Sequence, residues 1–114
     1  MRMSSPSKNK GSEYERNTVA LLVAHGWVNA ERTRAGWQDD RGDIDGVPGV
    51  TFECKNQQKM ELAQWVDELR VEMVHGRNEV GAVIHKRRGI ADVGAHYATM
   101  PVSVFLDLLK RAGY

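Results

Sequence analysis

Two acids and a lysine near the middle of the chain have the types and the spacing to hold a divalent cation beside a reacting water. Asp43 belongs to the segment Gly-Asp-Ile-Asp-Gly, and Glu53 and Lys55 follow it on either side of Cys54. Two carboxylates that leave further positions for water and phosphate suit magnesium better than zinc. A lysine beside the second acid reaches the same place, where it can orient or help deprotonate a water and offset charge on a phosphate.

These side chains share a site only if the strands that carry them are in the right register. Segments 43–45 and 50–55 are predicted to form a β-hairpin in which apolar and polar side chains alternate. A two-residue Pro48-Gly49 loop would put Asp43 opposite an apolar position, and it would be a type II turn, which splays hairpin strands. A loop with an odd number of residues instead pairs Asp43 with Glu53. We predict the odd loop, in which the two acids repel unless a cation lies between them.

The same residues also fit a hairpin that has no site. Gly-Asp-Ile-Asp-Gly would then be a turn and Glu-Cys-Lys a solvated face, because an isolated Glu-x-Lys is common on strands. The combination of both motifs with facing acids favours a site. Asp45 lies on the same face of the predicted strand as Asp43 and is an alternative ligand.

The order of elements expected around this hairpin is α-β-β-β-α-β-β-α, which makes the chain an α/β protein. Helical spacing predicts a first helix over 13–25, begun by a capping box of Ser12 and Glu15. A second helix ends near Gly76, with Glu72 among the polar residues outside its apolar stripe. Pro101 opens a third helix. The residues expected on the inward face of that helix are Val102, Phe105, Leu108, Leu109 and Ala112.

The remaining strands are expected over 27–34, 79–86 and 95–100. The polar stretch 35–42 is predicted to be an exposed loop in which Trp37 packs against the hairpin.

Length and composition indicate one domain over 12–114, preceded by a flexible basic tail over 1–11. The 41% hydrophobic and 27% charged residues are typical of a globular protein, and no apolar run approaches the length of a membrane span. The single cysteine excludes an intrachain disulfide and a cysteine cage for zinc, and it fits a reducing cytoplasm. Sixteen basic and fifteen acidic residues nearly cancel, so nucleic acid would have to be bound by local patches.

Asp43 followed by Glu53-Cys54-Lys55 resembles the signature of the PD-(D/E)XK nuclease superfamily, with Gly42 where the signature has proline. That resemblance implies a restriction-endonuclease-like core, a central mixed β-sheet flanked by helices. Further short segments resemble archaeal-type Holliday-junction resolvases and their phage relatives. These segments are Lys10-Gly11-Ser12, Glu15-Arg16, Gly26-Trp27 and Arg34-Ala35-Gly36.

The resemblance implies a phosphodiester hydrolase that uses magnesium, or manganese in its place, to cut branched DNA as a homodimer. Asp43 and Glu53 would hold the metal, the carbonyl of Cys54 would add a ligand, and Lys55 would serve the attacking water. Glu15 would match a further acid of the site. A DNA-end or single-strand nuclease of the RecB type shares this chemistry, and a catalytically silent nucleic-acid-binding module shares the fold.

Glu15 has two interpretations from the residues themselves. As the third helical residue it would cap the helix backbone, whereas its spacing to Val19 and Leu22 places it towards the apolar stripe, where a solvated acid is unexpected. Cationic side chains gather in three places and are candidates for phosphate contacts. They are Lys8 and Lys10 in the tail, then Arg32 and Arg34, then Lys86, Arg87 and Arg88, and Arg16 is a further candidate.

Overall fold

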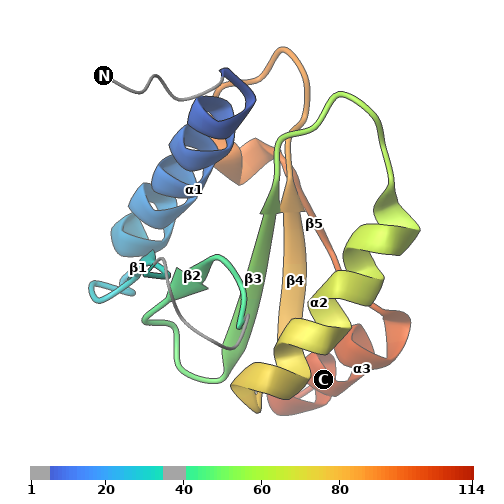
Figure 1. The fold of residues 1–114 in the computed structure, drawn as a ribbon. Helices are drawn as coiled ribbons and strands as arrows, with labels where there is room; N and C mark the ends of the chain where they lie inside the picture. The colour runs from blue at the N-terminus through green and yellow to red at the C-terminus, as the bar shows by residue number, and fades with distance from the viewer. Residues whose placement is uncertain (1–5, 35–40) are drawn as a thin grey trace.

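The computed structural model describes residues 6–34 and 41–114, as an α/β fold with a central sheet between helices (Figure 1). The predicted order of elements is confirmed, with one short 3-10 helix added. The elements are α1 (Pro6–Ala24), β1 (Glu31–Arg32), β2 (Ile44–Asp45), β3 (Val50–Lys55), α2 (Leu62–Gly76), β4 (Val80–His85), η1 (Val93–Ala95), β5 (Tyr97–Thr99) and α3 (Val102–Arg111).

The central sheet has the order β3-β4-β5 and is mixed, as predicted. β3 runs parallel to β4, with Glu53 beside Val83, and β5 runs antiparallel to β4. Two adjacent parallel strands need a crossover connection, and α2 supplies it. The carboxyl ends of β3 and β4 therefore meet at one edge of the sheet, close to the first turns of α1 (Figure 1).

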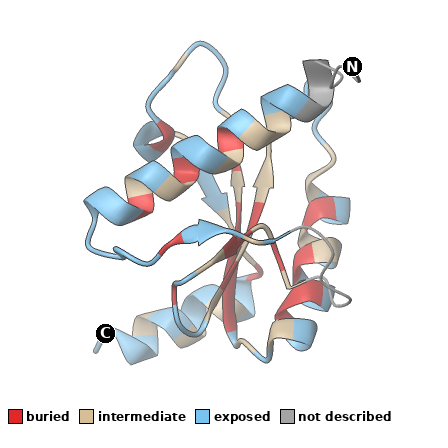
Figure 2. Ribbon diagram, turned by 60° about the vertical axis from the view of Figure 1, so that its left-hand side comes forward, coloured by how far each residue is buried: buried red, intermediate tan, exposed pale blue. Residues whose placement is uncertain are grey.

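Both faces of β3 are covered, so the protein has two apolar clusters rather than one. On one face Phe52 and Cys54 pack towards α1 through a cluster that includes Leu22 and Ile44. On the other face Leu69 and its neighbours on α2 pack against β4. Figure 2 shows the resulting buried band along the sheet and the inner sides of α1 and α2. The acidic face of β3 thus lies under α2 and is not a solvated surface.

The first helix begins earlier than predicted. It starts at Pro6, a residue tolerated in the first helical turn because it has no N–H to donate there, and not near Glu13. Residues 6–11 of the predicted tail therefore belong to α1, while residues 1–5 lie outside the described part. Ser12 and Glu15 stand inside the helix, so the predicted capping box is wrong.

The last helix has the predicted position but not the predicted packing. Pro101 precedes it as the N-cap, and none of its residues is buried. Val102 and Phe105, both expected to face inward, are exposed, and so are Leu108 and Ala112. The helix contacts the core chiefly through Val104, which packs beside α2. The amphipathic pattern correctly predicted a helix but could not show how little of it the sheet would cover.

The predicted hairpin between segments 43–45 and 50–55 does not form as a ladder, because β2 pairs antiparallel with β1. The amide of Val50 donates to the carbonyl of Val47, and Gly49 has φ 81°. The two-residue Pro48-Gly49 turn is therefore present, and the prediction of a loop with an odd number of residues is wrong. Gly46, at φ 90°, lets the chain pass directly over the backbone of Asn29, where a Cβ would overlap the Asn29 carbonyl. This close approach places β2 beside β1, so that the two strands pair with each other.

No helix among residues 6–34 and 41–114 is long and apolar enough to span a membrane. The predicted loop over 35–42 and the packing of Trp37 fall mainly on residues outside the described part.

Candidate active site

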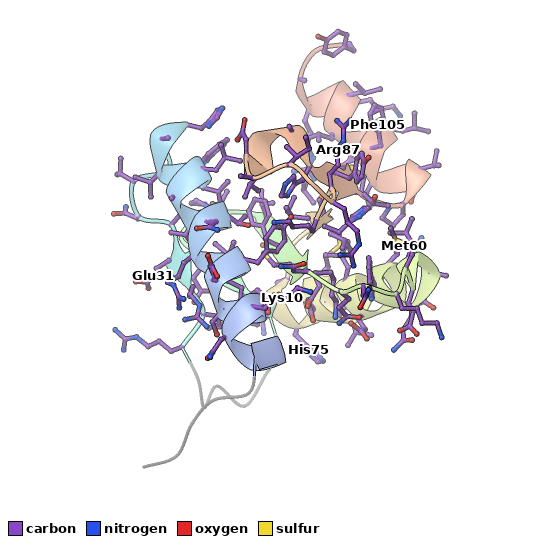
Figure 3. The ribbon with its side chains drawn as sticks, turned by 90° about the horizontal axis from the view of Figure 1, so that it is seen from above. Lys10, Glu31, Met60, His75, Arg87 and Phe105 are labelled. Carbon is purple, nitrogen blue, oxygen red and sulfur yellow. The ribbon has the colours of Figure 1, made fainter. Side chains whose placement is uncertain are left out.

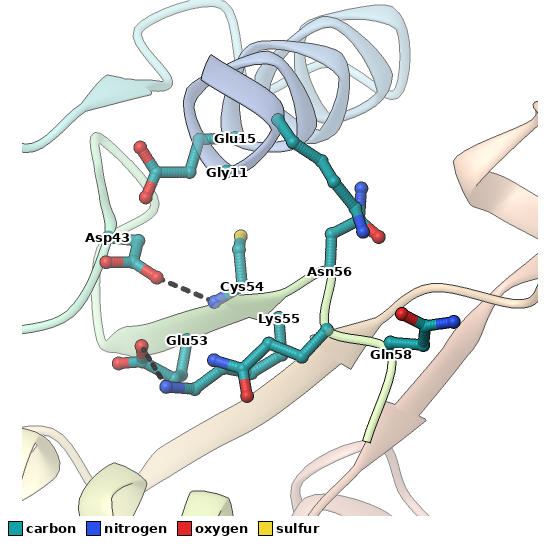
Figure 4. Close-up of a pocket in the computed structure, with 10 residues that line it drawn as sticks. Gly11, Glu15, Asp43, Glu53, Cys54, Lys55, Asn56 and Gln58 are labelled. Atoms are coloured by element: carbon teal, nitrogen blue, oxygen red, sulfur yellow. Dashed lines mark hydrogen bonds and ion pairs between the residues drawn. The ribbon is translucent and has the colours of Figure 1, made fainter. Parts of the chain in front are cut away.

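The predicted acids and lysine open onto one pocket of about 500 Å³, formed where α1, the segment before β2 and the end of β3 meet (Figure 4). In this view Asp43 lies next to the backbone of Cys54, while Glu53 lies on the other side of the β3 ribbon with Lys55 beside it. The residues lining the pocket are Lys10, Gly11, Glu15, Asp43, Glu53, Cys54, Lys55, Asn56, Gln57 and Gln58. Asp45, the alternative ligand, does not line it.

Asp43 is fixed to the edge of β3 by two hydrogen bonds. Its amide donates to the carbonyl of Phe52 at 2.7 Å, and its carboxylate accepts a hydrogen bond from the amide of Cys54 at 2.7 Å (Figure 4). The first bond satisfies an edge carbonyl of the sheet, and the second orients the acid. Asp43 therefore lies alongside Glu53 by local hydrogen bonding and not by the odd-loop register.

Gly42 makes this placement possible. Its φ is 102°, and a Cβ on it would lie 2.7 Å from the carbonyl oxygen of Phe52. A proline, with φ near −65°, could not adopt this conformation. The departure from the nuclease signature at this position thus has a backbone reason.

Gly42→Ala is expected to lower both stability and activity, because the new methyl group must push β3 away from Asp43. We expect a loss of roughly 2 kcal/mol in the free energy of unfolding, measured by urea titration. Gly89→Ala is the matched control, since Gly89 has φ 79° but nothing within 4 Å of its would-be Cβ. Equal losses in the two variants would show that the contact with Phe52 contributes nothing.

Glu53 is buried, with 7% of its surface exposed, and lies between cationic and acidic neighbours. One oxygen is 3.6 Å from the Nζ of Lys55, while Oε2 receives no hydrogen bond from the residues the structure describes. Burial, followed by hydrogen bonding and charge from Glu72 on α2, raises the pKa of Glu53 to about 9. The carboxylate oxygen Oε2 of Glu53 therefore needs either a shared proton or a nearby cation.

The pKa of Asp43 is raised in the same way as that of Glu53. Burial, and next the charge of Glu53, raise the pKa of Asp43 to about 8, although the Cys54 amide acts in the opposite direction. Besides burial, the charge of Glu53 thus raises the pKa of Asp43, and the charge of Glu72 raises the pKa of Glu53, so these neighbouring carboxyls disfavour full ionisation. A divalent cation between them would remove that conflict.

Lys55 is held as a cation. Its ammonium lies 2.9 Å from the carboxylate of Glu68, which anchors it from α2. Burial alone would lower the pKa of Lys55, but the hydrogen bond to Glu68 and the charges of Glu53, Glu68 and Asp43 outweigh it and raise the pKa. In this arrangement Lys55 suits charge stabilisation and orientation better than proton abstraction.

Glu15 lines the pocket from the middle of α1 and does not cap the helix. Its carboxylate forms an ion pair with Arg32 at 2.9 Å, and Arg32 also donates to the hydroxyl of Ser12 at 3.1 Å. This pairing ties β1 to α1 beside the pocket. It also accounts for Arg32, a predicted DNA contact, as a partner of Glu15.

The other predicted cations are distributed unevenly. Lys10 lines the pocket, whereas Arg16, Arg34 and Arg87 are exposed and do not line it. Lys86 and Arg88 border a neighbouring pocket, described below.

Two acids on α2 were missed by the sequence analysis. Glu72 was assigned to the solvated side of its helix, yet it is buried, with 5% exposure, against Glu53. Its spacing from Leu69, three residues earlier, is the signal that could have placed it on the inner face. Glu68, the partner of Lys55, has the same spacing from the buried Trp65, three residues before it.

Within residues 6–34 and 41–114, no group of three or more His, Cys, Asp or Glu side chains is placed to hold a metal ion. The candidate ligand set is therefore the Asp43 and Glu53 pair. Comparison with protein-family models, with curated proteins and with solved structures finds no match for this chain. The fold and the pocket together define an α/β protein with a pair of acids, of which Glu53 is buried, beside a lysine.

Proposed function

We propose that this protein is a magnesium-dependent, structure-selective DNA endonuclease of the Holliday-junction-resolvase type. The observation that carries the proposal is the pair Asp43 and Glu53 beside the cationic Lys55. Glu53 is buried, and one of its oxygens receives no hydrogen bond from the residues that the structure describes. Packing alone gives no reason to keep two such acids together, because buried unpaired carboxylates are costly. A site that binds a divalent cation and a phosphate gives a reason to keep these two acids together.

The residues fit magnesium. Magnesium is commonly bound by one or two carboxylates and completes its coordination with water and substrate phosphate oxygens. Asp43 and Glu53 would supply the carboxylates, and the carbonyl of Cys54 would add a third protein oxygen. Manganese, which takes the same oxygen ligands, would substitute.

In the proposed mechanism the magnesium ion, when bound, supplies Lewis acidity towards the scissile phosphate and the attacking water. Glu53 and Asp43 hold their carboxylates in fixed positions, the latter through the Cys54 amide. Lys55, oriented by Glu68, places a positive charge where the phosphate gains negative charge. Glu15 adds a further negative charge at the pocket wall, balanced by Arg32.

The substrate part of the proposal is a branched DNA cut by a homodimer, since two strands must be cut symmetrically. The test is incubation of the purified protein with a four-way junction, linear duplex and single strands, each with and without magnesium. Paired cuts near the crossover that require magnesium are the expected result. Degradation from DNA ends would favour a RecB-type nuclease, and binding without any cleavage would identify a silent binding module.

A further inference from the structure

A second pocket, of about 310 Å³, adjoins the candidate active site and has the opposite charge. The two pockets share Lys10 and Asn56 as a common wall. The residues lining the second pocket are Lys10, Glu13, Tyr14, Asn17, Asn56, Lys86 and Arg88. Three cations thus face a single acid, Glu13, whereas the first pocket is lined by more acids than cations.

The second pocket is built by elements that hold one another in place. The loop after β4 is tied to the catalytic strand because the amide of Lys86 donates to the carbonyl of Lys55 at 3.1 Å. The same loop is tied to α1 because the Tyr14 hydroxyl and His96 Nδ1 are 2.9 Å apart, and the other ring nitrogen of His96 lies 2.7 Å from the carbonyl of Ile90. Tyr14 is almost fully buried, with 3% exposure.

The loops after β3 and β4 also meet at this pocket. The guanidinium of Arg88 reaches the carbonyl of Gln57 at 3.5 Å, which directs it towards the wall between the two pockets. Lys10 reaches the same wall from the first turns of α1, and it is labelled there in Figure 3. Cations from two separate segments, α1 and the loop after β4, therefore converge beside the acid pair.

We propose that this second pocket binds a neighbouring phosphate of the same DNA strand whose scissile phosphate lies over Asp43 and Glu53. The inference rests on the proposed function. The charge contrast carries it: an acidic pocket can approach a phosphate only through a cation, whereas a pocket with excess lysine and arginine contacts one directly. The substrate class that follows is a strand that continues past the cleaved bond, rather than a small phosphodiester.

Arg88→Ala tests the second pocket, with Arg87→Ala as the matched control because Arg87 is its exposed neighbour outside the pocket. Binding of a four-way DNA junction is measured against salt concentration with calcium in place of magnesium. Loss of one phosphate contact is expected to reduce the slope of log K against log salt by about 1 in Arg88→Ala. The slope of Arg87→Ala is expected to remain closer to that of the parent protein.

Steady-state hydrolysis of the same four-way junction and of bis(p-nitrophenyl) phosphate, which has one phosphodiester, is measured in parallel with magnesium. Arg88→Ala should raise KM for the junction and leave hydrolysis of the small diester unchanged. An unaltered salt slope, or equal losses on both substrates, would overturn the second phosphate site. A parent protein that hydrolyses neither substrate would overturn the proposed function instead, while the salt slope would still decide the second pocket.

Discussion

Glu53→Gln and Lys55→Ala are each expected to remove magnesium-dependent DNA cleavage and to leave DNA binding largely in place. The glutamine keeps the shape of Glu53 but loses the negative charge that would hold the cation, and the alanine removes the charge that faces the phosphate. We expect each rate constant to fall by about 10²-fold or more under single-turnover conditions. Cleavage is measured on the four-way junction and binding by gel shift with calcium.

Lys59→Ala is the control for these variants. Lys59 lies near the same end of the sheet, but its side chain is 84% exposed and pairs only loosely with Glu61, at 3.5 Å. Its loss should leave cleavage close to that of the parent protein. Unchanged cleavage by both Glu53→Gln and Lys55→Ala would exclude this pocket as the active site.

The stability of the protein without divalent cations is expected to fall as pH rises. The pKa values of Asp43 and Glu53 are raised to about 8 and about 9, whereas both acids titrate near pH 4 in an unfolded chain. The folded state therefore retains protons that the unfolded state releases. The stabilising contribution is complete below about pH 4, and it disappears as pH passes through about 8 to 9.

Urea titrations in EDTA between about pH 5 and pH 9 measure this effect, which we expect to reach at least ~2 kcal/mol. Glu53→Gln should flatten the dependence because it removes one titrating acid and the repulsion on Asp43. Glu31→Gln, a change at an exposed acid, should keep the parent dependence. Added magnesium should restore stability at high pH, because an ion that binds only the folded state stabilises it. A flat profile for the parent protein in EDTA would contradict the raised pKa values.

The order of elements could be predicted because it depends on local periodicity. Val50, Phe52 and Cys54 alternate, and Trp65, Leu69 and Met73 recur at helical spacing, whatever the rest of the chain does. The joining of Asp43, Glu53 and Lys55 in one pocket was also anticipated. The reason was wrong, because it relied on a regular hairpin, whereas the carboxylate of Asp43 is oriented by the amide of Cys54.

What could not be predicted depends on contacts between distant segments. The pairing of β2 with β1 follows from the passage of Gly46 over Asn29, which no pattern within the segment 43–55 discloses. The burial of Glu72 and the exposure of Phe105 depend on how far each helix lies over the sheet. The second pocket, likewise, joins Lys10 to Arg88 across most of the chain.

The parallel pairing of β3 with β4 has a consequence for synthesis of the protein. β3 carries Glu53 and Lys55, but its ladder partner begins only at Val80, after the whole of α2. A nascent chain that has emerged from the ribosome only as far as α2 contains both residues and lacks the strand that holds them in place. Because such non-local pairing forms late, the acid pair assembles only after β4 has been synthesised, and chains that stop before β4 have no organised site.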